Sequence, residues 1–208
     1  MGTSLGDRGG GEEDLKPTEA SVVASKHLRE SARVKLALSR RSAGSFRKAA
    51  GLLIDSLKQG GKVLIFGNGG SAADAQHFAA ELVGRFMTER RGLPAIALTT
   101  DSSVLTSISN DYGFKYSFSR QVEALGETKD VVVAITTSGA SANVMEAVRT
   151  ARKKGLRVIG MTGAKGKGMA RFCDACFVVP SLSTPRIQEA HTTIVHILCE
   201  VTDENFKA

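Results

Sequence analysis

A histidine and a carboxylate stand four positions apart in the first half of the chain. On a helix, His77 and Glu81 differ by ~40°, so both side chains share one face. An imidazole beside a carboxylate can bind a divalent metal ion, transfer a proton, or form an ordinary surface ion pair. The spacing therefore indicates a candidate site and leaves its chemistry open.

The C-terminal segment carries further donor side chains at helical spacing. Gln188 and His196 differ by ~80° around a helix, whereas His191 lies ~140° from His196 and points elsewhere. Together with the first pair, Gln188 and His196 would complete a divalent metal site with an open coordination position. Alternatively, Glu81 and His196 would form an acid–base pair that moves a proton.

Hydroxyl groups are concentrated in the segment 136–141, which reads Thr-Thr-Ser-Gly-Ala-Ser and follows a buried apolar run. Four hydroxyls, with the free backbone N–H groups of a helix that opens near Asn143, can surround a phosphate dianion. The segment contains no Lys or Arg, so dipoles and hydrogen bonds must stabilise the charge. A turn that merely caps a helix is the alternative. We predict that a phosphomonoester binds through the loop hydroxyls of Thr136, Thr137, Ser138 and Ser141.

Two other loops are rich in small polar residues. The segment 67–71, Gly-Asn-Gly-Gly-Ser, leads into a predicted helix, for which Ser71 and Asp74 form a capping-box pattern. It lacks the spacing of a dinucleotide fingerprint and the Lys-Ser/Thr pair of a Walker loop, so it is either an anion-binding helix start or a tight turn. Asn110 and Asp111, in a later loop, can hydrogen-bond a polyhydroxy substrate or simply form a turn.

The elements that must position these loops are visible as short, almost entirely apolar runs. Four of the five lead into a Gly-, Ser- or Thr-rich turn and then a helical pattern, which is typical of a parallel sheet covered on both faces. We therefore predict a three-layer α/β/α domain whose ligands bind at the carboxyl ends of the strands. The predicted strands are Val63–Phe66, Ala95–Thr99, Val131–Thr136, Val158–Met161 and Cys176–Val179.

Helical patterns frame this core. Residues 1–17 lack any apolar period and are expected to form a disordered tail. Residues 18–60 predict two helices, near 19–39 and 42–59, which pack on the domain and in an oligomer, and residues 61–208 form the main domain. A final helix is expected with Thr184 as its cap and Pro185 at its first position. Its apolar stripe is Ile187, Ala190, Ile194, Leu198 and Val201.

Composition excludes several functional classes. The 208 residues, 42% hydrophobic and 24% charged, suit one globular domain, and no apolar run approaches the ~18 residues of a membrane helix. Most of the net charge of +7 falls in residues 21–60, and the chain has no Trp, which disfavours nucleic-acid binding. Three cysteines indicate a reducing cytoplasm. Cys173 and Cys176 form a C-x-x-C without two further ligands nearby, and Cys199 is expected in the core.

Four segments, in this order, carry a family resemblance: GNGGSAADAQHFAAELVGRF, LTTDSSVLTSISNDYGF, TTSGASANV and STPRIQEAHTTIVH. Over residues 20–204 the chain resembles the sugar isomerase (SIS) domain family, and within it the isomerases of seven-carbon phosphosugars. The resemblance implies a five-stranded parallel sheet and a homotetramer with active sites at subunit interfaces. It also implies interconversion of sedoheptulose 7-phosphate and D-glycero-D-manno-heptose 7-phosphate, the first step of nucleotide-activated heptose synthesis for bacterial surface glycans.

The resemblance also assigns residues. It implies one zinc ion per subunit, held by His77, Glu81, Gln188 and His196. It implies substrate contacts from Asn68, Gly69, Gly70, Glu81, Asn110, Asp111, Thr136, Thr137, Ser138, Ser141 and Gln188. One departure is visible, because the phosphate loop of the family often begins with Ser where this chain has Thr136. A hydroxyl is retained, so phosphate binding is expected to survive.

Both lines of reasoning lead to the same mechanism. An aldose–ketose isomerisation needs a base at the C1–C2 face and an acid at the oxygens, and we assign these roles to Glu81 and His196. If both side chains ligate zinc throughout turnover, neither is a free base, so either a ligand dissociates or the metal is structural. Two alternatives remain: a non-catalytic SIS protein of the replication-initiator-associating type, which binds a protein partner, and an isomerase of a different phosphosugar.

Overall fold

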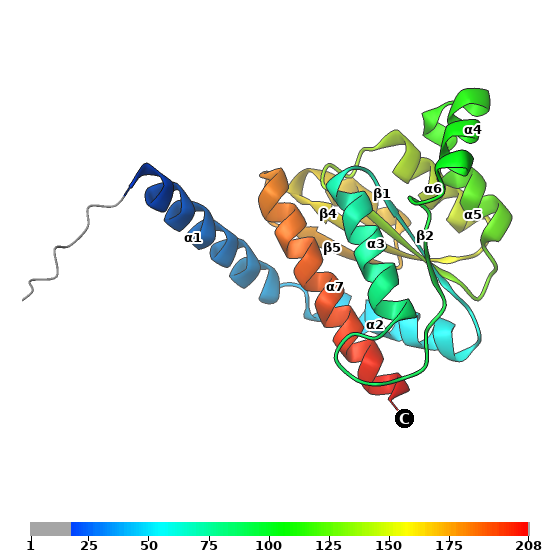
Figure 1. The fold of residues 1–208 in the computed structure, drawn as a ribbon, viewed down its shortest axis with the longest axis horizontal. Coiled ribbons are helices and arrows are strands. Elements are labelled where there is room, and N and C mark those ends of the chain that lie inside the picture. The colour runs from blue at the N-terminus through cyan, green and yellow to red at the C-terminus, as the bar shows by residue number, and fades with distance from the viewer. Residues whose placement is uncertain (1–17, 208) are drawn as a thin grey trace, which may run out of the picture.

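The computed structural model describes residues 18–207 and contains a five-stranded parallel sheet in the order β2-β1-β3-β4-β5 (Figure 1). This is the predicted fold class. The predicted strand positions are confirmed to within a few residues, although the second strand ends two residues earlier than expected. The tail predicted over residues 1–17 lies outside the described residues. The strands are Val63–Gly67 (β1), Ala95–Ala97 (β2), Val131–Thr136 (β3), Arg157–Gly163 (β4) and Ala175–Val179 (β5).

Helices cover both faces of the sheet. One face packs against α1 (Glu19–Ser39), α2 (Ala43–Lys58), α3 (Gly70–Val83) and α7 (Thr184–Phe206). The other face packs against α4 (Ser102–Tyr112), α5 (Ser119–Leu125) and α6 (Ala142–Lys153). Two short 3₁₀ segments complete the described chain, η1 (Phe114–Tyr116) and η2 (Ala164–Phe172). Every residue of β1 and β3 is buried, because each strand side lies under a helical layer.

The strand order reverses between β1 and β3. From β1 the chain runs to β2 on one side and then crosses to β3 on the other, with Gly67 paired to Ile135 at the carboxyl edge. In open parallel sheets, the loops that follow two such strands diverge and leave a crevice where ligands bind. The glycine-rich loop after β1 and the hydroxyl-rich loop after β3 therefore flank the expected ligand position.

Three local predictions about helix ends and faces need correction. The cap of α7 is Ser183, and Thr184 is already helical. Its apolar stripe is buried as far as Leu198, but Val201 is 39% exposed, because it lies on the solvent side of α7 while its neighbours Thr202 and Asp203 are buried. Ser71 and Asp74 do not form a capping box, since α3 starts at Gly70 and the Asp74 carboxylate binds α7 instead.

The first helix extends away from the sheet (Figure 1). Only Val34 and Leu38, near its C-terminal end, are buried against the domain. Among the described helices, none combines the length and the apolar character needed to cross a bilayer.

Candidate active site

The site is built on α3 and α7, which lie side by side and run in the same direction from the carboxyl edge of the sheet (Figure 1). Near the start of α3, a β-carbon added to Gly70 would lie 2.1 Å from Nε2 of Gln188, so only glycine allows this amide so close. One turn further along, the hydroxyl of Thr192 donates to Oδ1 of Asp74 at 2.9 Å. Burial raises the pKa of the Asp74 carboxyl, although the hydrogen bond from Thr192 by itself would lower this pKa. These contacts fix the register of the two helices.

The next contact between the same helices brings the candidate catalytic groups together. Nε2 of His77 lies 3.0 Å from Oε1 of Glu81, as the four-residue spacing predicted. The ring of His77 meets the ring of His196 edge-on, with centroids 5.1 Å apart. Phe86 stacks on His196 at 5.3 Å and limits its rotation. The side chains of His77 and Glu81 are 41% and 24% exposed, so a ligand can reach them.

Gln188 is the fourth predicted metal ligand. It sits beside Gly70, two turns of α7 before His196. The nitrogen and oxygen donors of His77, Glu81 and His196 suit zinc by their chemistry. Within residues 18–207, however, no group of three or more His, Cys, Asp or Glu side chains is arranged closely enough to hold a metal ion.

The hydroxyl-rich loop after β3 forms a compact cradle. Oγ1 of Thr136 lies 3.1 Å from Oγ of Ser141 and 3.4 Å from Oγ of Ser138. The backbone N–H of Gly139 donates to Thr136, and that of Ala140 donates to Ser138, each at 3.2 Å. Three of the four predicted hydroxyls therefore converge where α6 begins, and Ser138 is exposed to incoming ligands. Thr137 makes no side-chain hydrogen bond within the described chain.

Asn68 is held at the mouth of the crevice by a residue to which the sequence analysis gave no role in the site. Its amide exchanges two hydrogen bonds with the amide of Asn143, at 2.8 and 2.9 Å, across the gap between the loops after β1 and β3. Asn143 also donates to the buried hydroxyl of Ser117 at 3.2 Å. The sequence feature that could indicate this bridge is the amide side chain of Asn143 just after the hydroxyl run. From the sequence alone, this residue predicts only the start of a helix.

Asn110 and Asp111 are not joined to these groups. Both are exposed at the end of α4, and within residues 18–207 their side chains hydrogen-bond only each other, at 2.8 Å. A substrate role for this pair stays a prediction.

His191 and the cysteines lie elsewhere. His191 is completely buried, neither ring nitrogen has a hydrogen-bond partner among the described residues, and burial lowers its pKa to about 4. Cys199 is also fully buried, as predicted. The thiols of Cys173 and Cys176 interact with each other, which raises the pKa of Cys173 and lowers that of Cys176.

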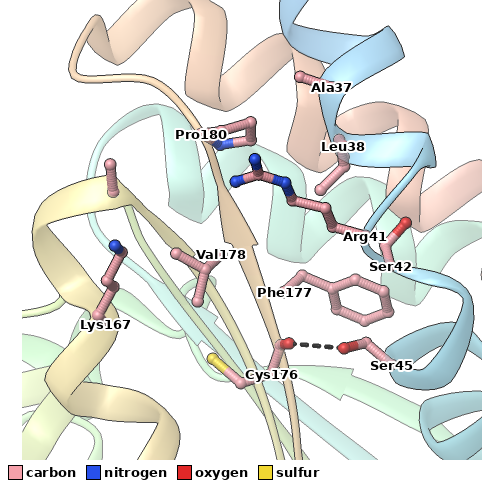
Figure 2. A pocket seen from close by; sticks show the side chains of 11 residues that line it. Ala37, Leu38, Arg41, Ser42, Ser45, Lys167, Cys176, Phe177, Val178 and Pro180 are labelled. Carbon is pink, nitrogen blue, oxygen red and sulfur yellow. Dashed lines mark hydrogen bonds between the residues drawn. The ribbon is translucent and has the colours of Figure 1, made fainter.

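A separate cavity lies far from the predicted chemistry. It measures about 440 Å³ between the end of α1, the start of α2 and β5 (Figure 2). Arg41 points into it beside Pro180, and the Ser45 hydroxyl donates to the backbone oxygen of Cys176 at 2.9 Å. No predicted site residue lines this cavity.

Known proteins share both the sequence and the fold. The SIS domain family matches residues 26–163. A phosphoheptose isomerase of Geobacter sulfurreducens is 57% identical over 177 residues, which cover 85% of this chain and 94% of the relative. The solved phosphoheptose isomerases of Neisseria gonorrhoeae and Francisella tularensis superpose with TM-scores of 0.83 and 0.85, at 46% and 37% identity. Each comparison covers 90% of this chain and all of the other.

The chain belongs to the SIS domain family. The relatives named here, which match it along most of their length, are phosphoheptose isomerases.

Proposed function

We propose that the protein is an aldose–ketose isomerase that converts sedoheptulose 7-phosphate to D-glycero-D-manno-heptose 7-phosphate through an enediol. This would be the first step of nucleotide-activated heptose synthesis for bacterial surface glycans. The observation that carries the proposal is the convergence of Glu81, His77 and His196 between α3 and α7. The phosphoheptose isomerase names of relatives at 55–57% identity support the choice of substrate.

The proposed chemistry needs one proton moved between adjacent carbons. Glu81 is the base that removes the proton from the carbon next to the carbonyl, and His196 donates to and accepts from the oxygens. His77, bonded to the Glu81 carboxylate at 3.0 Å, orients the base toward the substrate. Phe86 covers one face of His196 and holds the imidazole in place.

The phosphate end of the substrate would bind in the hydroxyl cradle. Thr136, Ser138 and Ser141 present their hydroxyls together, and the free N–H groups at the start of α6 favour an anion. Asn68 and the backbone of Gly69 and Gly70 line the opposite side of the crevice. Binding energy from this remote group would hold C1 and C2 against the base.

We also propose a zinc ion, one per subunit, for which His77, Glu81, His196 and Gln188 are the ligands. Zinc would polarise the sugar carbonyl and stabilise negative charge on its oxygen. Glu81 cannot bind a metal ion and accept a proton through the same oxygen, so the rate and the thermal midpoint, both measured with and without zinc, together separate a catalytic ion from a structural one.

The proposed assembly is a homotetramer in the cytoplasm, without nucleic acid or membrane as partner. Four large apolar side chains on α1 support it, because they are 48–71% exposed. Exposure of His77 also fits a site that a second subunit covers. Light scattering of the purified protein measures its mass directly. The four side chains are Val22, Val23, Leu28 and Leu36.

Incubation with sedoheptulose 7-phosphate tests the function. We expect the aldoheptose phosphate to accumulate toward equilibrium in the presence of zinc, and fructose 6-phosphate to react far more slowly. Absence of product with every phosphosugar tried, at any zinc concentration, would favour the alternative of a non-catalytic SIS protein that binds a protein partner. Faster conversion of another sugar would identify a different phosphosugar isomerase.

A further inference from the structure

A second cavity lies on the outer side of the hydroxyl-rich loop. It measures about 460 Å³ and is lined by Ser138, Gly139 and Ala140, by the first two turns of α6, and by η2. The catalytic cluster between α3 and α7 contributes none of its lining. Ser138 and its loop are shared with the hydroxyl cradle, whereas the parts of the lining on η1, α6 and η2 have no role in the proposed isomerisation.

Positive charge dominates the lining. Lys115 of η1, Arg149 of α6 and both Lys165 and Arg171 of η2 surround the cavity, so four cations come from three separate elements. One carboxylate, that of Glu146, lies 3.4 Å from Lys115 and 3.3 Å from Arg149.

In the described part of the chain, the two cations of η2 lack the carboxylate partner that Lys115 and Arg149 share. Within residues 18–207, Lys165 and Arg171 form no ion pair, and the Arg171 guanidinium lies over the ring of Phe172 at 4.8 Å. A site with several cations and one shared carboxylate attracts multivalent anions.

Three glycines of the hydroxyl loop and η2 line the cavity, and at two of them the backbones of the two segments approach closely. Gly139 has a φ of +67°, and a β-carbon there would lie 2.3 Å from the Cα of Gly166 in η2. Nothing lies within 4 Å of the position that a β-carbon on Gly168 would take. A ligand in the cavity would thus contact both η2 and the hydroxyl loop, as well as the cations.

We propose that this cavity, defined by Lys115, Arg149, Lys165 and Arg171, is a second anion site that binds a diphosphate group. A single phosphate already has its own cradle of hydroxyls, which contains no cation. A diphosphate places charge on two linked phosphates and can reach donors on both α6 and η2. The ligand class is therefore a compound with a pyrophosphate moiety.

Calorimetric titration of the full-length protein with inorganic pyrophosphate tests the site. The double variant Lys165→Gln/Arg171→Gln removes the two uncompensated charges, and we expect its affinity for pyrophosphate to fall at least about tenfold. Lys153→Gln is the matched control, because Lys153 is exposed on α6 outside the cavity. We expect this variant to bind as the wild type does.

A third variant distinguishes the two anion sites. Ser141 belongs to the hydroxyl cradle and does not line the cavity, so Ser141→Ala should weaken binding of inorganic phosphate and leave pyrophosphate binding unchanged. The proposal is overturned if the double variant binds pyrophosphate like the wild type, if Lys153→Gln loses as much affinity, or if Ser141→Ala abolishes pyrophosphate binding. None of these readouts depends on isomerase turnover, so failure of this site and failure of the proposed function are separate results.

Discussion

The imidazole rings of His77 and His196 meet edge-on with their centroids 5.1 Å apart, although one belongs to α3 and the other to α7. The Thr192–Asp74 hydrogen bond and the close approach of Gln188 to Gly70 align these helices at two earlier positions. The groups that could move a proton are therefore placed by a rigid pair of helices, and the groups that could hold a phosphate are placed by loops at the sheet edge.

The two histidines of α7 should behave differently on substitution. His196→Ala removes a ring from the candidate site, and we expect kcat to fall by about 10²-fold or more. His191→Ala removes a buried ring that faces the core, so it should lower the thermal midpoint while kcat of the folded protein changes little. Steady-state kinetics beside thermal unfolding separates these effects, and equal losses of kcat would mean that the face of α7 has been misassigned.

Ser138→Ala should weaken phosphate binding. Its hydroxyl lies 3.4 Å from that of Thr136 on the exposed side of the cradle, and the loss of one hydrogen bond to a charged group typically reduces affinity by about tenfold or more. KM for the phosphosugar should rise while the protein remains folded by circular dichroism. An unchanged KM would place the phosphate elsewhere.

His191 should make the protein sensitive to acid. Burial lowers its pKa from 6.5 to about 4, so the unfolded state takes up a proton at a higher pH than the folded state does. The contribution of His191 to the free energy of unfolding is fully present above the pKa of the unfolded state. It falls by roughly 3 kcal/mol as pH drops from about 6.5 to about 4. Urea unfolding across this range measures the loss. In His191→Phe, the free energy of unfolding should change little between these two pH values. If it falls with pH as steeply as in the wild type, other groups cause the acid sensitivity.

The buried pair of Arg90 and Asp203 should anchor the chain that follows α3. Nε of Arg90 lies 2.6 Å from Oδ1 of Asp203, and both side chains are almost fully buried. Burial alone would raise the pKa of Asp203, but hydrogen bonds from the backbone of Thr88, from Arg90 and from the backbone of Met87 hold it below the usual value. The contribution of the pair is therefore present above pH ~4 and lost as pH falls below that.

Asp203→Asn leaves the Arg90 charge buried without its partner, which typically costs about 3–5 kcal/mol. The thermal midpoint should fall by on the order of 10 °C. Glu204→Gln is the control, because this neighbour is exposed and, among the described residues, pairs only with the exposed Lys207. If the two variants have the same thermal midpoint, the buried pair contributes no more to stability than a surface ion pair does.

Much of the fold could be predicted from sequence, for reasons that are physical. The apolar runs of β1 and β3 are long enough to require cover on both faces, and the four-residue spacing of His77 and Glu81 fixes their contact within one helix. Contacts between elements could not be derived in the same way. The Asn68–Asn143 bridge, the stacking of Phe86 on His196 and the grouping of Lys115 with η2 depend on how distant segments pack.

The wrong prediction of a capping box at Ser71 and Asp74 has the same cause. Asp74 has the spacing of a capping residue, but its carboxylate is used to bind Thr192 of α7 instead. Gln188 shares a broad face with His196, but its close approach to Gly70 could not be derived from that spacing. Helical periodicity gives the face on which a side chain lies and does not give its partner.

The most direct measurement compares the conversion of sedoheptulose 7-phosphate by the wild type, by Glu81→Gln and by Glu89→Gln. Glu89 is exposed and, in the part of the chain that the structure describes, pairs only with Arg85 one turn away, so its variant removes an equal charge outside the site. The account predicts that Glu81→Gln loses at least about 10²-fold in kcat while its mass and thermal midpoint stay close to those of the wild type, and that Glu89→Gln keeps its activity. Near-normal turnover by Glu81→Gln would contradict the assignment of the base and with it the mechanism proposed for this site.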